Sequence, residues 1–231
     1  MFQTYLEGLA TRSFQLNQRN IVSLVSQRPH LRLCDLGCDD GAWTIELGQA
    51  ARAKEIHGVE IVRERATIAR TRGVAVTIAD LNHKLPYADE TFDVVHANQV
   101  IEHIADLDNF MTEVHRITKR GGTTIISTEN GSSWHNIGAA LLGWQTFSLT
   151  NVSPRVGGLG NPLALHRGQE GLAVSWTHKT IFNYRGLLEM HEVYGLHPVA
   201  VRGAGYHPFA PVVGSVDPRH AHLLAVMAIK A

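Results

Sequence analysis

Short apolar runs alternate along the chain with segments in which apolar residues recur at helical spacing. The runs are rich in Val, Ile and Leu, which is typical of buried strands. We predict five such strands, at 31–36, 54–60, 74–80, 92–98 and 123–128. Helices are predicted between them, at 42–53, from Val62 to Gly73, and at 107–117, with the Gly121-Gly122 pair ending the last. Strands that alternate with helices form parallel sheets with right-handed crossovers, so the pattern indicates an α/β fold.

The two ends of the chain extend this pattern. Residues 1–30 carry apolar positions at helical spacing and predict a helical cap of one or two helices, ending near Arg28 and Pro29. After residue 178 the alternation resumes, and we predict a helix at 180–194, closed by Gly195, a strand at 196–203 and a final apolar run at 222–230. We therefore expect a single domain over residues 1–231.

Residues 131–178 interrupt the alternation. They contain eight glycines, three of the four tryptophans and only three charged residues. A long solvated loop would be more polar, and long loops inside a domain are commonly functional. We therefore expect an ordered lid or a contact surface. Its aromatic side chains can form a wall against a substrate, or can bury the segment against the sheet or a partner: Trp134, Trp144, Phe147 and Trp176.

The composition narrows the class of protein. Hydrophobic residues make up 44% of the chain, enough to fill a core, whereas charged residues make up 18%. Lys+Arg and Asp+Glu number 21 each, so bulk charge gives no grip on nucleic acid or anionic lipid. No run has the roughly 18 apolar residues that span a bilayer. The two cysteines, Cys34 and Cys38, are too few for a disulfide scaffold, and we expect a cytoplasmic protein.

Acidic and glycine residues gather where the predicted strands end. The turn Asp35-Leu36-Gly37-Cys38-Asp39-Asp40-Gly41 follows the first strand, Glu60 ends the second and Asp80 ends the third. Ligands of parallel sheets bind beyond these carboxyl ends. A carboxylate at the second strand can accept two ribose hydroxyls, and one at the third can face an adenine amino group. The pattern thus favours a nucleotide-like ligand, although a Gly-rich turn alone is a weak signal and each acid alone can be an ordinary turn residue.

Binding of NAD is a different interpretation of the same turn. The dinucleotide fingerprint requires G-x-G-x-x-G, but here Gly37 is followed by Gly41 with no third glycine in register. Asp80 and the segment LPYADETFD also have no role in that interpretation. We therefore do not favour NAD as the ligand.

The motifs resemble those of class I S-adenosylmethionine-dependent methyltransferases, in particular the ubiquinone-type and sugar O-methyltransferases. The resemblance covers roughly residues 31–130 and the elements after 178. Its marks are DLGCDDG at 35–41, GVE at 58–60, AD at 79–80, LPYADETFDVVHANQVIEHI at 85–104 and KRGGTTIISTEN at 119–130. It implies a Rossmann-like, seven-stranded, mostly parallel sheet with helices on both faces and the last strand antiparallel. It also implies S-adenosyl-L-methionine as cofactor and S-adenosyl-L-homocysteine as product.

Carried over by position, the resemblance implies three groups of cofactor-binding residues. The methionine part would contact Asp35, Gly37, Cys38 and Gly41. Glu60 and Ile61 would hold the ribose and pack beside the adenine, and Asp80 and Leu81 would contact the adenine. Asn98 and Gln99 would flank the transferred methyl group. The chain departs from the family at Asp39, where a glycine is usual, and aspartate is among the residues that tolerate left-handed backbone.

Methylation of a hydroxyl requires a base, and histidine has a suitable pKa. His103 follows the fourth strand close to the expected methyl group, although a Glu-His pair at this place can also simply brace the loop. His135, His166 and His178 lie in or beside the 131–178 segment and can reach a substrate. We predict His103 as base, with His135, His178 and His166 as further candidates, and treat the remaining histidines, His207 and His222 among them, as structural or exposed.

A metal site is a further alternative at this place. The segment also resembles, more faintly, the E-x-x-E-H metal site of methyltransferases that modify small-RNA ends, but Gln99 stands where the first acid belongs. Because this removes a charged ligand, we predict no metal. The predicted function is methyl transfer to a small molecule, most favourably to a hydroxyl oxygen. Modification of RNA or protein, or cofactor binding without catalysis, are the alternatives, and we expect a monomer or homodimer without nucleic-acid or membrane partners.

Overall fold

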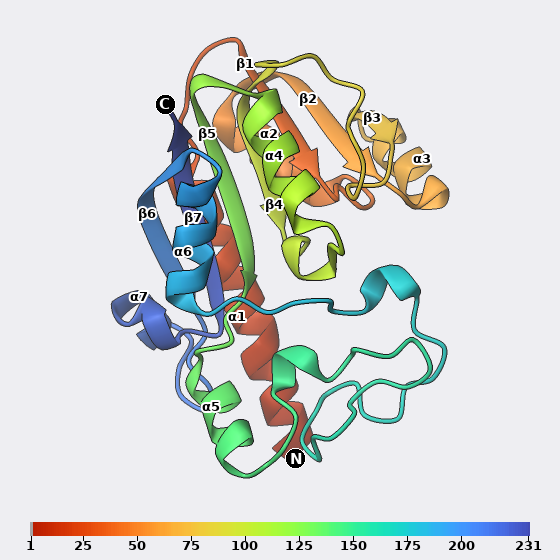
Figure 1. Ribbon diagram of the computed structural model, residues 1–231, viewed down its shortest axis with the longest axis vertical. Helices are drawn as coiled ribbons and strands as arrows, with labels where there is room; N and C mark the ends of the chain where they lie inside the picture. Colours follow the sequence, from red (N-terminus) through yellow and green to blue (C-terminus); the bar gives the residue numbers. More distant parts are fainter. Residues whose placement is uncertain (1) are drawn as a thin grey trace.

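The computed structural model describes residues 2–231, and its centre is one seven-stranded sheet (Figure 1). The strand order is β3-β2-β1-β4-β5-β7-β6, and β7 runs antiparallel to both of its neighbours. The strands are β1 (Leu31–Leu36), β2 (Ala53–Glu60), β3 (Ala75–Ile78), β4 (Phe92–Asn98), β5 (Thr118–Glu129), β6 (Leu196–Ala204) and β7 (Leu223–Lys230). This topology confirms the predicted Rossmann-like α/β fold with an antiparallel last strand.

Helices cover both faces of the sheet because apolar side chains of alternating strand positions point to opposite sides. On one face, Ile21 of α1 and Leu47 of α2 pack on Leu33 and Ile125 in one buried cluster. On the other face, Phe110 of α4 and Leu187 of α6 pack in a second cluster. The helices are α1 (Phe2–Leu24), α2 (Ala42–Ala51), α3 (Arg63–Thr71), α4 (Leu107–Ile117), α5 (Trp134–Leu141), α6 (Tyr184–Val193) and α7 (Val213–Val216).

The prediction for the fifth strand was wrong at its start. The structure begins β5 at Thr118, so the Gly121-Gly122 pair lies inside the strand rather than ending the preceding element. Gly121 has φ 66°, and the pairing with β4 jumps from Phe92–Thr118 to Val94–Thr123. Because glycine adopts this left-handed backbone without strain, the pair forms an irregularity within a strand that continues on both sides.

Two other boundaries also differ. The helix predicted from residue 180 begins at Tyr184, because Phe182 forms a bridge with Asn130 and its carbonyl accepts from Gly131 N at 2.8 Å. These contacts keep the preceding residues extended. The third strand covers only Ala75–Ile78, so Asp80 lies in the turn after it. β3 is an edge strand that pairs only with β2, so no second neighbouring strand stabilises an extended backbone beyond Ile78.

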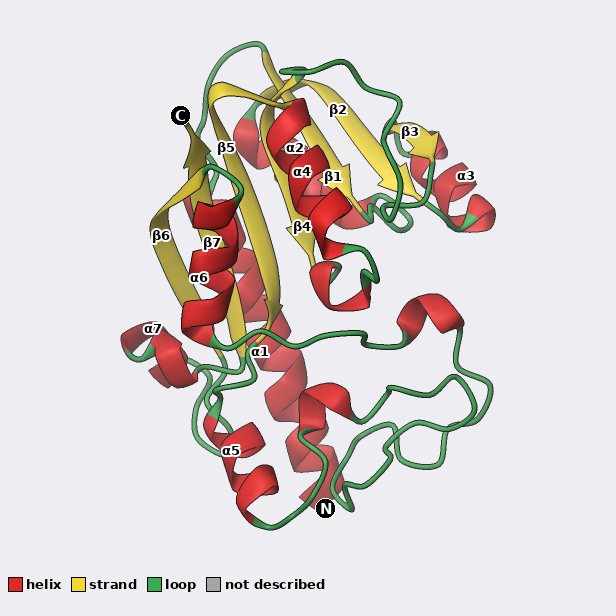
Figure 2. Cartoon of the chain, in the orientation of Figure 1, coloured by secondary structure: helices red, strands yellow, loops and turns green. Residues whose placement is uncertain are grey.

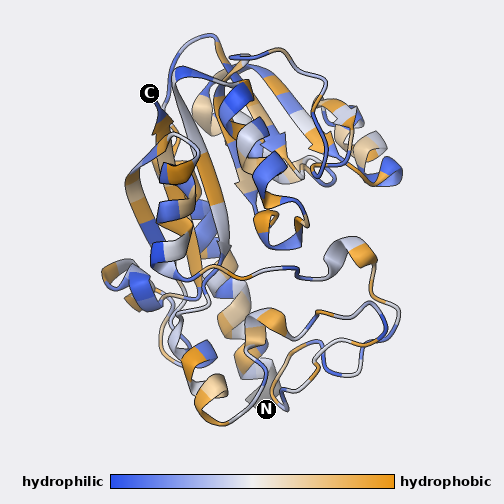
Figure 3. Cartoon of the chain, viewed as in Figure 1, coloured by the Kyte–Doolittle hydropathy of each residue, from blue (hydrophilic) through white to orange (hydrophobic). Residues whose placement is uncertain are grey.

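The N-terminal cap is a single helix, α1, whose first half extends past the strand ends (Figure 1). Figure 3 shows hydrophobic residues along this half of α1 and along α5, both of which lie below the sheet in this view. Within residues 2–231, no helix combines the length and the hydropathy needed to cross a membrane.

Residues 131–178 connect β5 to α6 and contain little regular structure (Figure 2). After α5 they form two short 3-10 turns, at Phe147–Leu149 and Val174–Trp176. Buried side-chain bonds nevertheless hold the segment together: Asn136 Nδ2 donates to Ser148 Oγ at 2.9 Å, and Asn161 Nδ2 donates to the carbonyl of Gln145 at 2.8 Å. The segment is therefore folded against α5 rather than extended, as the low charge predicted.

Candidate functional site

The turn after β1 has the backbone that its glycines predict. Gly37 and Gly41 have φ 76° and 77°, and a Cβ on Gly37 would lie 2.6 Å from Val100. Asp39 also adopts a left-handed backbone, with φ 47°, and its carboxylate pairs with Arg65 of α3. The side chain at the position where the family usually has glycine therefore points to α3, and the turn keeps its form.

Asp35 is buried, and each oxygen of its carboxylate has a partner inside the protein. Oδ2 accepts from Thr44 Oγ1 at 2.5 Å, and Oδ1 lies 2.7 Å from His96 Nδ1. Thr44 belongs to the first turn of α2, so Asp35 ties the end of β1 to the start of that helix. Its observed contacts thus order the turn.

Cys38 points into the protein. Its side chain packs with Ala69 and Val74, and a Cβ on Gly58 would approach its Sγ to 2.5 Å. Burial raises the pKa of the thiol to about 12, so it stays protonated and unreactive at neutral pH. Only the backbone of Cys38 is left to face a ligand.

Glu60 ends β2 and is buried, with both carboxylate oxygens turned toward neighbouring backbone. Oε2 accepts from Asp39 N at 3.0 Å and Oε1 from Val62 N at 2.8 Å. Each carboxylate oxygen has two lone pairs, so each can accept a further hydrogen bond from a ligand hydroxyl. Ile61 beside it is half-exposed.

Asp80 and Leu81 follow β3. Asp80 Oδ1 accepts from Asn82 N at 2.9 Å and from Asn82 Nδ2 at 2.8 Å, and these bonds lower the pKa of the carboxyl. Within residues 2–231, Oδ2 makes no hydrogen bond, so an ionised oxygen is available to a donor. Leu81 packs its side chain against the main core cluster.

Asn98 and Gln99 end β4. Asn98 Oδ1 accepts from Asn17 Nδ2 of α1 at 3.1 Å. Gln99 has φ 56°, and its amide N donates to the carbonyl of Ser127 at 2.8 Å. Its Nε2 is buried without a hydrogen-bond partner among the described residues, and such an orphaned donor costs free energy unless a ligand satisfies it.

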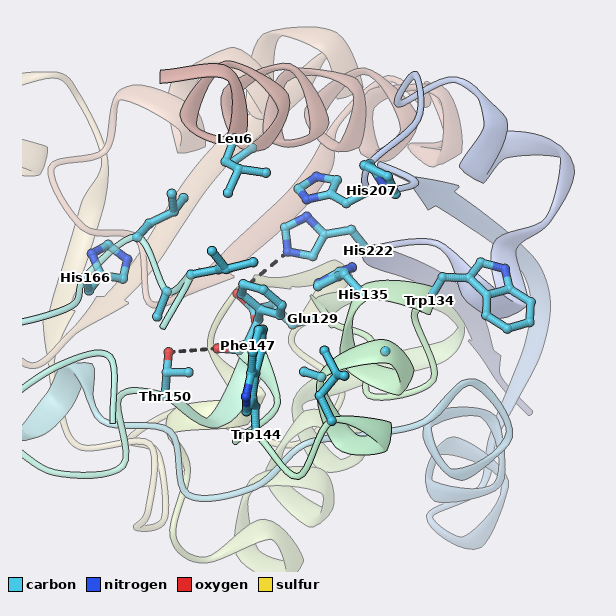
Figure 4. A pocket seen from close by; sticks show the side chains of 18 of the residues that line it. Leu6, Glu129, Trp134, His135, Trp144, Phe147, Thr150, His166, His207 and His222 are labelled. Carbon is cyan, nitrogen blue, oxygen red and sulfur yellow. Dashed lines mark hydrogen bonds and ion pairs between the residues drawn. The ribbon is translucent and has the colours of Figure 1, made fainter. Parts of the chain in front are cut away.

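A cavity of about 450 Å³ lies beside the end of β5 (Figure 4). Leu6, Ala10 and Phe14 of α1 form one wall, and α5 with the segment after it forms another. Of the four aromatic residues predicted to form a wall, three line this cavity, namely Trp134, Trp144 and Phe147. Trp176 lies elsewhere and contacts the ring of His166 edge to face at 5.9 Å.

Three histidines meet at one side of the cavity. The ring of His135 lies 5.0 Å from that of His207 and 4.9 Å from that of His222, and the last two are 4.6 Å apart. Burial lowers the pKa of His207 to about 3 and that of His222 to about 4, and it also lowers the pKa of His135. All three rings are therefore uncharged at neutral pH.

The other two predicted bases lie in a separate cluster. Glu102, His103 and His178 each offer one ligand atom, all within 4.8 Å of one another. Burial raises the pKa of Glu102 to about 8, and it lowers that of His103 to about 4. That no metal binds at this cluster stays a prediction, which rests on Gln99 at the position of the first acid.

Sequence reasoning missed three cavity residues. His207 and His222 were treated as structural or exposed, and Glu129 received no role. Glu129 is the last residue of β5, so its place at a strand end is the same signal that selected Glu60 and Asp80. The histidines gave no such signal, because the chain reversals around β6 and β7 bring them to the cavity.

Comparison with known proteins agrees with this geometry. Residues 34–126 match the family model described as a methyltransferase domain. Over 222 residues the chain is 26% identical to an uncharacterized 37.1 kDa protein in transposon TN4556 of Streptomyces fradiae, which covers 89% of this chain and 62% of that protein. Over 105 residues it is 33% identical to a ubiquinone biosynthesis O-methyltransferase of Sinorhizobium fredii, covering 43% and 42%. The chain thus spans less than two thirds of the length of these relatives.

A solved structure shares the whole fold. The S-adenosylmethionine-dependent methyltransferase of Thermotoga maritima, described as a possible histamine N-methyltransferase, superposes with a TM-score of 0.63 at 18% identity. The superposition covers 100% of this chain and 98% of that one. Seven strands, their order and the helical layers are therefore those of this class of enzyme.

Proposed function

We propose that this chain, a class I S-adenosylmethionine-dependent methyltransferase, transfers the cofactor's methyl group to a small molecule bound in the cavity beside β5. The observation that carries the proposal is the position of this cavity. Its floor residue Glu129 ends β5, whose neighbour β4 ends at Asn98. The register pairs Asn98 with Ser127, and Asn17 of α1 bonds to both. The cavity and the residues expected to flank the methyl group are therefore held by the same pair of strands and by α1.

The residues at the strand ends fit the cofactor. Glu60 has lone pairs for the ribose hydroxyls, Asp80 Oδ2 for the adenine amino group, and the orphaned Gln99 Nε2 gains a partner when a ligand binds. When bound, the cofactor supplies a methyl group on a sulfonium, which is already electrophilic. The contribution required of the protein is mainly placement of the acceptor close to that carbon.

A small-molecule acceptor suits the cavity better than a macromolecule does. Its volume lies within the range of ordinary ligand pockets, and its walls are mostly apolar and aromatic. No lysine or arginine of the described residues lines it, whereas a protein that modifies RNA requires cations to hold phosphates. We favour oxygen as the methylated atom, as in the ubiquinone biosynthesis relative, over nitrogen, which the name of the Thermotoga maritima protein suggests for that enzyme.

Loss of either strand-end carboxylate should weaken cofactor binding. Glu60→Gln and Asp80→Asn keep the shape of each side chain but remove its charge and one acceptor oxygen. We expect the Kd for S-adenosylmethionine, measured by isothermal titration calorimetry, to rise roughly 10-fold to 100-fold, the usual effect of a hydrogen bond to a charged group.

The matched control is Glu64→Gln, because Glu64 is an exposed glutamate in the first turn of α3, close to Glu60 in the sequence. Its Kd should equal that of the wild type. Wild-type affinity in both strand-end variants, or no binding of the cofactor by the wild-type protein, would remove the proposed cofactor site.

A further inference from the structure

Among the described residues, Glu129 is the one acidic residue that lines the cavity, and no lysine or arginine lines it. The lining histidines are His166 and the buried cluster of His135, His207 and His222, whose rings are uncharged at neutral pH, as described above. On the side of the cavity where the three buried histidines lie, a single carboxylate therefore sets the charge that an acceptor meets.

Glu129 also lies next to the place where the methyl group is expected. In the parallel pair of β4 and β5, Asn98 is opposite Ser127. Glu129 is two residues further along β5, so its side chain leaves the same face of the sheet as that of Ser127, one step closer to the strand end. Figure 4 shows it directed into the cavity toward His222.

Glu129 and His222 face each other without a direct hydrogen bond. Glu129 Oε1 lies 4.0 Å from His222 Nε2, which is too long for a hydrogen bond. His222 Nδ1 is buried without a partner in the described chain, so the proton of the neutral ring is best placed on Nε2, facing the carboxylate. The N–H of His222 can donate a hydrogen bond to a ligand hydroxyl, and the carboxylate of Glu129 can accept one from it. The pair therefore suits a hydroxyl group that contacts both side chains.

We propose that Glu129 binds the hydroxyl of an uncharged, mainly apolar acceptor and takes its proton during methyl transfer, with His222 as a positioning residue. This inference rests on the proposed function. It assigns the role of the base to Glu129 rather than to His103. His103 belongs to the cluster with Glu102 and His178, and its Nδ1 lies 3.3 Å from the carbonyl oxygen of Thr177.

The reaction step balances as follows. The hydroxyl proton moves to a carboxylate oxygen of Glu129 while a lone pair of the acceptor oxygen forms the new bond to the methyl carbon. The bond between that carbon and the sulfonium sulfur breaks, and its electron pair stays on sulfur as a thioether. The product is an uncharged methyl ether, and Glu129 then passes the proton to water.

The same arrangement excludes anionic acceptors. A carboxylate or phosphate placed at the floor would meet Glu129 within a few ångströms in a poorly solvated cavity. Like charges at such separations repel strongly enough to weaken binding by about 100-fold or more. The acceptor is therefore expected to be a phenol or alcohol with an apolar body.

Three probes of one shape test this inference. 2-Naphthol carries a hydroxyl, naphthalene lacks it and 2-naphthoate carries an anion in its place. We expect the protein to bind 2-naphthol about 10-fold more tightly than naphthalene and about 100-fold more tightly than 2-naphthoate, measured by competition with a fluorescent apolar dye. In Glu129→Gln the affinity for 2-naphthoate should rise at least 10-fold. The exposed Glu170→Gln is the matched control and should leave the order unchanged.

His222 is tested as a positioning residue with two variants. His222→Leu removes the donor that faces Glu129 and should abolish the preference for 2-naphthol over naphthalene, whereas His222→Gln, which keeps an N–H donor, should retain most of it. Equal binding of 2-naphthoate and 2-naphthol by the wild type, or an unchanged affinity for 2-naphthoate in Glu129→Gln with wild-type thermal stability, would overturn the inference. These assays contain no cofactor, so their failure is distinct from failed binding of S-adenosylmethionine.

Discussion

Three glutamates of this protein have different chemical roles because their surroundings differ. Glu60 accepts two backbone N–H bonds, Glu102 is fully enclosed beside Thr128, and Glu129 lines a cavity. The sequence marks Glu60 and Asp80 through their places at strand ends. It also contains the same mark at Glu129, but nothing in the local pattern reveals that a cavity lies there. The side chain of Cys38 is buried against Gly58, and the backbone N of Gln99 donates to the carbonyl of Ser127. No local sequence pattern predicts these contacts.

Glu102 should make the protein less stable as the pH rises. Its pKa in the folded state is about 8, well above the ordinary value, because burial disfavours the ionised form. Between the two pKa values the unfolded chain holds fewer protons, so stability falls with increasing pH until about pH 8. From pH 6.5 to 8 the loss should be about 2 kcal/mol.

Glu102→Gln checks this pH effect. The variant keeps an oxygen for the bond from Thr128 Oγ1 but does not titrate. Urea unfolding at pH 6.5 and pH 8 should show a decline for the wild type and for the exposed control Glu189→Gln, and a nearly flat profile for Glu102→Gln. An equal decline in all three proteins would contradict the protonated state of Glu102.

At the scale of elements, α1 links the sheet to the cavity. Its fully buried polar residue Asn17 donates to Asn98 Oδ1 and to Ser127 Oγ, and its Ser13 Oγ lies 3.2 Å from His207 Nε2. The helical spacing of residues 1–30 predicted such a helix, and the alternation predicted β1 to β4 and α2 to α4 in nearly correct places. The start of β5 and of α6 could not be predicted, because pairing with β4 and with Asn130 decides them.

Asn17→Leu should remove the hydrogen bonds between α1 and the sheet without greatly changing the volume of the side chain. Asn98 Oδ1 and Ser127 Oγ would each lose a buried partner, which costs about 1–3 kcal/mol. The free energy of unfolding from urea titration should fall by this amount. In the double variant Asn17→Leu, Ser127→Ala the loss should be smaller than the sum of the two single losses, because both changes break one shared bond. Strict additivity would show that the bond contributes nothing.

At the scale of the whole molecule, the histidine cluster connects parts far apart in the sequence. His135 belongs to α5, His207 follows β6 and His222 precedes β7, and α1 packs over them through Phe14. Residues 131–178 therefore close the cavity together with both ends of the chain. Length and composition predicted that this segment is ordered, but the meeting of three histidines depends on the complete topology.

Acid should destabilise this assembly. The folded pKa values of His207 and His222, about 3 and about 4, lie below the ordinary value near 6.5. Between these limits the unfolded chain binds more protons, so the stability that the two uncharged rings contribute is complete above pH 6.5 and is lost as the pH falls toward 4. Each ring should contribute a loss of roughly 2 kcal/mol between pH 6.5 and pH 5.

His207→Gln should reduce that loss, and the exposed His197→Gln should not. Thermal unfolding of the three proteins at pH 6.5 and pH 5 gives the comparison. An equal change of Tm between the two pH values in the wild type and in His207→Gln would show that the ring of His207 already carries its proton in the folded protein.

The position of α1 determines where a label can be attached. The helix begins at the end of the molecule opposite to residue 231 (Figure 1), and Tyr5 in its first turns donates to the carbonyl of Pro208, itself a cavity residue. A fluorophore or affinity handle fused ahead of α1 would therefore sit close to the cavity. One fused after residue 231 would lie away from the cavity, so carboxyl-terminal fusions are the ones to use for turnover assays and for immobilisation.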